Sequence, residues 1–192
     1  MSQVPKQQNT NDTTQPLSIK DRLPSLQYHL IFWPLTISAI ILDLWSKAAV
    51  FHWIRDLRQY SPYPIIDGIL QFVVAENTGA AFGIASGKTY MLISVSLAAL
   101  VAIILLFLFG NIKQKLMIVA LALFTAGICG NLYDRIFNEG RVRDFIDVVY
   151  FPGKHWPAFN IADSLLCVSV ALMFISSLLT EMQSRKHDQQ QK

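Results

Sequence analysis

The sequence has little charge and little cysteine for its length. Only 15% of its 192 residues are charged, whereas 53% are hydrophobic. Soluble domains are usually about 25% charged, so this composition argues against an ordinary soluble protein. Its two cysteines, Cys129 and Cys167, both lie in apolar stretches and outside any CxxC pattern. Such isolated cysteines are typical of small core residues and give no indication of disulfides.

Motifs for a metal centre are also missing from the sequence. None of the four histidines lies in an HExxH motif or at the spacing of paired ligands. We therefore expect neither a metal nor another cofactor. The formal net charge of +3 is small, and the placement of the charges matters more than their sum.

Long apolar blocks are what the sequence has in abundance. A helix needs about 20 residues to cross a hydrocarbon core of roughly 30 Å. The blocks of this length are Tyr28–Val50, Tyr90–Phe109, Leu116–Tyr133 and Ile161–Thr180. The predicted fold is mostly α: a polytopic membrane protein whose four transmembrane helices form one membrane domain over residues 28–180.

Polar segments flank this domain at both ends. Residues 1–27 are rich in Gln, Asn, Thr, Ser and Pro and are predicted to be a disordered tail, and residues 181–192 form a second polar tail. The turn Gly110–Lys115 carries two lysines and no acid. Short loops with this bias are typical of the cytoplasmic side, so we expect both tails in the cytoplasm.

The segment Phe51–Thr89 is the longest non-membrane stretch of the amino-terminal half. Within it, the β-branched and aromatic residues of Ile69–Ala75 follow several turn-forming residues, which predicts short strands. The glycines and small residues of Glu76–Gly83 then allow close backbone approach. We expect a small β-containing extracytoplasmic platform between the first and second helices.

The stretch Asn131–Asp163 joins the third apolar block to the fourth. Two of its acids, Asp144 and Asp163, are predicted to lie where the chain leaves and re-enters the lipid. Carboxylates there are costly unless they are paired, hydrated or used. Two carboxyl groups held close share one proton, so one can activate water while the other polarises a scissile carbonyl. The pair therefore predicts an aspartyl protease site at the membrane edge.

Structural interpretations compete with this one. Asp163 follows Asn160 at the spacing of a helix N-cap and a first-turn acid. Asp43 and Lys47 stand at i and i+4 in the first block. They form either an ion pair near the outer membrane edge, where Lys47 can snorkel, or a support for the active site.

The remaining acids of the central stretch also leave alternatives open. A local salt bridge to Arg135, or capping, is enough to explain Asp134, and the sequence alone does not separate Asp147 from Asp144. Three other functions compete with a protease: an ion or proton transporter, a structural subunit, and a two-carboxylate metal hydrolase. A transporter would place its acids near the membrane midplane, and a metal hydrolase would need further ligands.

Five motifs in chain order resemble those of the bacterial lipoprotein signal peptidases, also called type II signal peptidases, a family of aspartyl peptidases. The motifs are Asp43-x-x-x-Lys47, Asn77-x-Gly79-Ala80-Ala81-Phe82-Gly83, Gly130-Asn131-Leu132-x-Asp134-Arg135, Gly140-x-Val142-x-Asp144-Phe145 and Phe159-Asn160-x-Ala162-Asp163. Each is weak alone, but five in order make a strong resemblance, which covers about residues 28–180.

The resemblance implies an intramembrane aspartyl endopeptidase without a cofactor. Its substrate would be a prolipoprotein whose cysteine carries diacylglycerol, cut just before that cysteine. The enzyme would act as a monomer among the lipids of the bacterial inner membrane, with its site near the outer face, sensitive to globomycin and without a nucleic-acid partner.

The resemblance also implies residue roles. Asp144 and Asp163 match the catalytic pair. The residues that match substrate-binding or site-orienting positions are Asn77, Asn131, Arg135 and Asn160, and those that match supporting positions are Asp43, Lys47, Gly79, Ala80 and Phe82. One departure is Arg143, a cation where an apolar or small residue is expected beside Asp144. Another is Ala126-Gly127-Ile128-Cys129, where a more glycine- and alanine-rich approach to Asn131 is expected.

Overall fold

The computed structural model describes residues 23–80 and 83–190, and within them four helices are long and apolar enough to cross a membrane. They are α2 (Leu26–Phe51), α3 (Thr89–Phe109), α4 (Lys115–Phe137) and α5 (Ile161–Gln190). A π-helical segment, η1 (His52–Leu57), extends α2. Each helix contains one predicted block, so the prediction of four membrane helices is confirmed. Helix α5 continues past Thr180 to Gln190, and most of the predicted amino-terminal tail lies outside the described residues.

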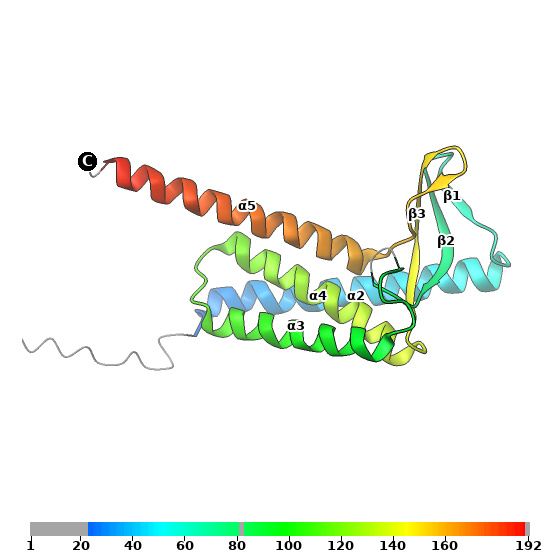
Figure 1. The fold of residues 1–192 in the computed structure, drawn as a ribbon, viewed down its shortest axis with the longest axis horizontal. Coiled ribbons are helices and arrows are strands. Elements are labelled where there is room, and N and C mark those ends of the chain that lie inside the picture. Colours follow the sequence, from blue (N-terminus) through cyan, green and yellow to red (C-terminus); the bar gives the residue numbers. More distant parts are fainter. Residues whose placement is uncertain (1–22, 81–82, 191–192) are drawn as a thin grey trace, which may run out of the picture.

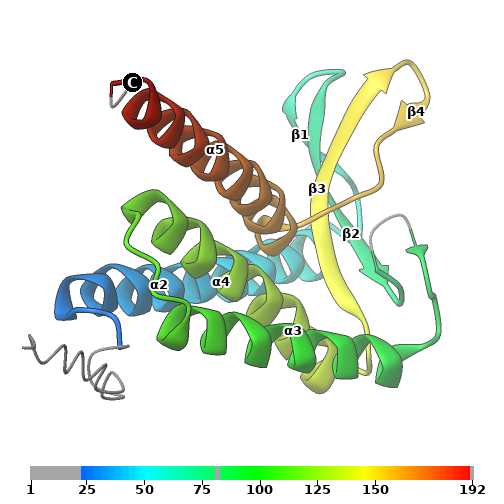
Figure 2. The ribbon, with the colours of Figure 1, turned by 60° about the vertical axis from the view of Figure 1, so that its left-hand side comes forward.

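The helices run side by side, and a small sheet stands across one end of them (Figures 1 and 2). The end of α2, the start of α3, the end of α4 and the start of α5 meet at the sheet. The turn between α3 and α4 lies at the opposite end, with the start of α2 and the end of α5. The two ends of the described chain therefore lie on the side away from the sheet.

Four antiparallel strands form the sheet in the order β1 (Tyr63–Ile66), β2 (Leu70–Asn77), β3 (Val142–Phe151) and β4 (Lys154–His155). The first two confirm the predicted strands between the first and second helices. The other two come from the central stretch, where no strands were predicted. Strand pairing depends on partners distant in sequence, so a local pattern did not show that β2 would find β3.

Helix α4 is the centre of the bundle. In the most apolar part of α4, 61% of the residues are buried, compared with 11% in the corresponding part of α3 and 17% in that of α5. A Cβ at Gly127 would lie only 2.7 Å from the carbonyl oxygen of Ala162, and one at Gly130 would overlap the carboxylate of Asp43. These glycines therefore allow α5 and α2 to approach α4 closely.

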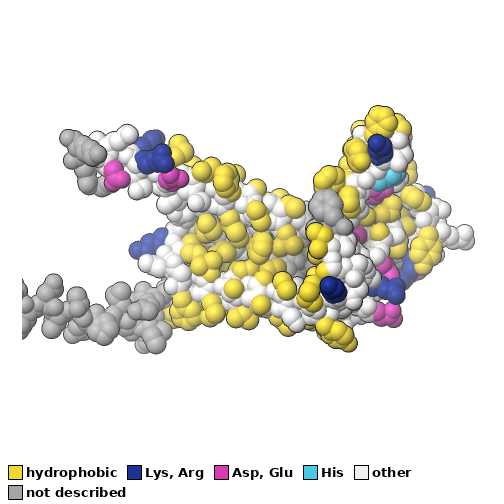
Figure 3. Space-filling model, viewed as in Figure 1, with side chains coloured by type: hydrophobic (Ala, Val, Ile, Leu, Met, Phe, Trp, Pro, Cys, Tyr) yellow, Lys and Arg dark blue, Asp and Glu magenta, His cyan; other side chains and the backbone are white. Residues whose placement is uncertain are grey.

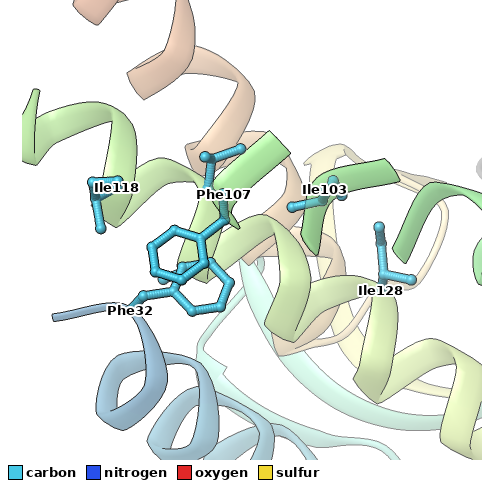
Figure 4. Packing of buried hydrophobic residues seen from close by; sticks show 7 residues of the cluster. Phe32, Ile103, Phe107, Ile118 and Ile128 are labelled. Carbon is cyan, nitrogen blue, oxygen red and sulfur yellow. The ribbon is translucent and has the colours of Figure 1, made fainter. Parts of the chain in front are cut away.

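The apolar core lies at the end of the bundle away from the sheet. The rings of Phe32 in α2 and Phe107 in α3 stack with centroids 4.1 Å apart, beside Ile118 of α4 (Figure 4). On the outside, hydrophobic side chains cover the middle of the helices, whereas charged ones gather at the two ends (Figure 3). This pattern is expected of helices that face lipid. The buried charged side chains of the helices, Asp43, Lys47, Asp134 and Arg135, lie instead at the end beneath the sheet.

Candidate active site

Asp144 and Asp163 come together where β3 meets the start of α5. Asp144, on β3, is only 2% exposed, and Asp163 is half-buried in the first turn of α5. Two asparagine amides bridge them. Asn160 Nδ2 donates to Asp144 Oδ1 at 2.7 Å, and Asn131 Nδ2 donates to Asp163 Oδ1 at 2.8 Å. Asn160 Nδ2 also lies 3.1 Å from Asn131 Oδ1, which completes the chain of contacts between the acids.

Asn160 and Asp163 also form a reciprocal helix cap. The backbone N–H of Asp163 donates to Asn160 Oδ1 at 3.0 Å, and the backbone N–H of Asn160 donates to Asp163 Oδ2 at 3.2 Å. This is a capping box in which asparagine and aspartate take the two roles. The structural interpretation of Asp163 therefore holds, and its other oxygen still faces Asn131. The cap therefore orients the Asp163 carboxylate, which together with Asp144 forms the predicted catalytic pair, called the dyad below.

Burial dominates the electrostatics of Asp144. Loss of solvation, together with the nearby charge of Asp163, raises the pKa of Asp144 to about 7. Hydrogen bonds from Asn160 and Asn77 and the charge of Lys47 act in the opposite direction. Asp144 therefore holds a proton near neutral pH, which a shared-proton dyad requires of one member.

Lys47 lies in a buried cluster behind the dyad. Its Nζ is 2.8 Å from Asp43 Oδ2, 3.3 Å from Asp134 Oδ2 and 3.1 Å from Asn131 Oδ1. The side chains of Lys47, Asp43 and Asp134 are all 0% exposed. The predicted ion pair between Asp43 and Lys47 is present, but Lys47 does not snorkel to the membrane edge, because its three partners hold the ammonium inside. Asp43 also accepts a hydrogen bond from the backbone N–H of Ala162 at 2.8 Å, which ties α2 to α5.

Asp134 binds Arg143 rather than its neighbour Arg135. Arg143 donates to Asp134 Oδ1 from Nη2 at 2.6 Å and from Nε at 3.1 Å, and its backbone N–H reaches Asp134 Oδ2 at 3.0 Å. The local salt bridge to Arg135 was therefore the wrong explanation of Asp134. Because successive side chains of a strand point to opposite faces, Arg143 turns to Asp134 while Asp144 turns to Asn160.

Arg135 instead holds the loop that follows β2. Its Nη2 donates to the carbonyl oxygen of Gly79 at 2.7 Å, and its Nε has no hydrogen-bond partner among the described residues. Asn77 Oδ1 accepts from the backbone N–H of Gly79 at 2.8 Å, and Ala80 donates its N–H to Ile84 at 2.7 Å. A Cβ at Gly79 would meet the backbone of the loop's other arm at 2.8 Å, so only glycine fits there.

Phe82, predicted as a supporting residue of this loop, lies outside the described residues. Because Arg135 of α4 holds the backbone of this loop, Asn77, Gly79 and Ala80 lie at the same end of α4 as the dyad.

Asp147 belongs to a separate contact that holds the sheet together. Its Oδ2 accepts from Gln71 Nε2 at 2.6 Å and lies 2.8 Å from His155 Nδ1, which links β2, β3 and β4. The structure thus separates Asp147 from Asp144, which the sequence alone did not. Gln71, His155 and Arg143 were missed as partners, although strand alternation around Asp144 was a usable signal for Arg143. Among the described residues, no group of three or more His, Cys, Asp or Glu side chains could hold a metal ion.

The fold and the site define a multi-pass membrane protein of the aspartic peptidase class. Its helices span the membrane, and two linked carboxyl groups lie under a small sheet. Residues 35–179 match the family model described as signal peptidase (SPase) II, so the chain belongs to the signal peptidase II family.

Named relatives agree with this assignment. The lipoprotein signal peptidase of Geobacter metallireducens is 37% identical over 159 residues, covering 81% of this chain and 95% of that protein. That of Bacillus pumilus is 36% identical over 150 residues, covering 78% and 94%. A bacterial membrane enzyme solved by the in meso method at 2.3 Å resolution superposes with a TM-score of 0.70 at 29% identity, covering 85% of this chain and 94% of that one.

Proposed function

We propose that the protein removes signal peptides from prolipoproteins, cutting just before the diacylglyceryl-modified cysteine, with Asp144 and Asp163 as the catalytic pair. The observation that carries this is the bridge of Asn160 and Asn131 between the two carboxyl groups. The family membership supplies the class of substrate.

The chemistry needs one proton on the pair. With its pKa raised to about 7, Asp144 is assigned this proton, and Asp163, in the first turn of α5, is assigned the role of general base. Asp163 takes a proton from water, which attacks the scissile carbonyl carbon, while Asp144 gives its proton to the carbonyl oxygen. When the C–N bond breaks, the proton held by Asp163 passes to the leaving amine, and Asp144 regains its own.

The other polar residues would bind or orient. Asn131 and Asn160 hold the carboxyl groups, and Arg135 and Asn77 shape the loop over them. Arg135 Nε, which is buried without a partner among the described residues, is free to donate to a backbone carbonyl of the substrate.

The bilayer would align the substrate. We place the sheet at the outer face of the bacterial inner membrane and both termini in the cytoplasm, with residues 1–27 and 181–192 as polar tails. The diacylglyceryl group then stays in the lipid while the cysteine reaches the dyad, which lowers the entropic cost of alignment. The protein acts as a monomer, needs no cofactor or nucleic acid, and is inhibited by globomycin.

Cleavage of a diacylglyceryl-modified prolipoprotein, with a chelator present, tests this proposal. The wild type should cut, and folded Asp144→Asn and Asp163→Asn variants should not, because asparagine cannot act as an acid or base. Asp147→Asn is the matched control, since it removes a carboxylate of the same strand that serves the sheet. Near-normal turnover by either dyad variant would overturn the assignment. No cutting by a folded wild type would favour the transporter alternative.

A further inference from the structure

Arg143 makes the tightest ion pair near the dyad, yet it points away from it. Its guanidinium binds Asp134 Oδ1 through two nitrogens, at 2.6 Å and 3.1 Å. Asp134 is fully buried, and Arg143 is 20% exposed. Paired contacts of this kind fix direction as well as charge, which a lone lysine contact does not.

The ion pair between Arg143 and Asp134 affects which acceptors the Lys47 ammonium contacts. An ammonium has three donors, and here they face Asp43, Asp134 and Asn131. The longest of the three contacts, 3.3 Å, goes to Asp134, the acid that Arg143 already neutralises. Without Arg143, Asp134 would be a buried carboxylate with Lys47 as its remaining cationic contact among the described residues. The ammonium would then be drawn toward Asp134 and away from Asn131.

Asn131 passes this effect on to the dyad. Its Oδ1 accepts from Lys47 at 3.1 Å, which leaves Nδ2 to donate to Asp163 at 2.8 Å. Because an asparagine amide has one acceptor and one donor end, the ammonium, together with Asn160 Nδ2 at 3.1 Å from the same oxygen, holds the donor end toward the catalytic carboxylate.

The charges of the buried groups around the dyad also balance. The groups that face one another are Asp43 and Lys47 from α2, Asp134 and Arg135 from α4, Arg143 and Asp144 from β3, and Asp163 from α5. Glu76 of β2 binds Arg141 at 2.7 Å on the exposed side instead. Four carboxyl groups thus face three cations, so a single proton on the dyad makes the set neutral. Loss of one cation would favour a second proton there.

We propose that Arg143 is a positioning residue for the dyad: by neutralising Asp134 it keeps Lys47 on Asn131 and keeps the dyad singly protonated in the working pH range. This rests on the proposed function, and it gives the departure from the family pattern at this position a defined role.

The test compares Arg143→Gln with Arg141→Gln, a matched loss of one charge at an exposed neighbour whose side chain is 47% exposed. The pH dependence of kcat/KM is measured for cleavage of a diacylglyceryl-modified prolipoprotein. In R143Q both limbs of the profile should move to higher pH by about 0.5 to 1 unit, because a lost nearby cation makes proton release costlier. The profile of R141Q should match the wild type, and Arg143→Lys should bring both limbs back toward it.

A double variant, Asp134→Asn with Arg143→Gln, removes the two charges together. Its profile should lie near that of the wild type, and it replaces R143Q if that variant does not fold. The proposal is overturned if R143Q and R141Q have the same profile, or if the double variant is displaced as far as R143Q. Absence of cleavage by the wild type in the same assay would instead refute the proposed function.

Discussion

Replacing Asn160 by alanine should move the basic limb of the cleavage profile to higher pH. Asn160 is fully buried, and its Nδ2 lies 2.7 Å from Asp144 Oδ1. That N–H stabilises the ionised form of Asp144, so its loss makes deprotonation less favourable and raises the pKa from its value of about 7. A hydrogen bond to a charged group contributes about 1.5–3 kcal/mol, which corresponds to a shift of roughly one to two pH units.

The same change removes the cap of α5, because Asn160 Oδ1 accepts from the backbone N–H of Asp163 at 3.0 Å. Losing an N-cap costs about 0.5–2 kcal/mol of stability. Asn160→Ser is the matched control, since serine keeps a capping oxygen but lacks the amide. It should restore stability and leave the pH shift in place.

The assay is kcat/KM for prolipoprotein cleavage across the pH range, with thermal unfolding in detergent measured in parallel. A basic limb that stays in place, or moves to lower pH, in a folded Asn160→Ala variant would refute the reasoning. It would mean that the amide does not act on the ionised form of Asp144.

The remaining predictions concern the dyad, the packing and the sheet. Wild-type cleavage should fall about tenfold per pH unit above the Asp144 pKa of about 7, as measured by kcat/KM. Gly130→Ala should lower the free energy of unfolding by about 1–3 kcal/mol, because the new methyl overlaps the Asp43 carboxylate; thermal unfolding checks this. Lys47→Met should cost about 3–5 kcal/mol by leaving the buried Asp43 carboxylate without its cation, and pairing it with Asp43→Asn should recover part of that loss. Asp147→Asn should leave kcat unchanged while hydrogen exchange in β4 becomes faster, because its contact to His155 serves only the sheet.

The membrane helices were readable from composition because lipid imposes a local rule. A span must be long, apolar and internally hydrogen-bonded, and each predicted block satisfied this without reference to the others. The cap at Asn160 and Asp163 was readable for a similar reason, since both partners lie within one turn. The partner of Arg143 was missed, because it depends on which face of β3 Arg143 occupies and no strand was predicted there.

Sequence alone therefore determined the class of protein, its helices and, through motifs spread along the chain, the residues to consider. Only the tertiary structure decided that Asp134 serves Arg143 and Lys47, that Asp147 serves the sheet, and that two asparagines join Asp144 to Asp163. The physical reason is range. Apolar length and capping act between near neighbours, whereas a buried charge takes its partner from whichever element folding brings against it.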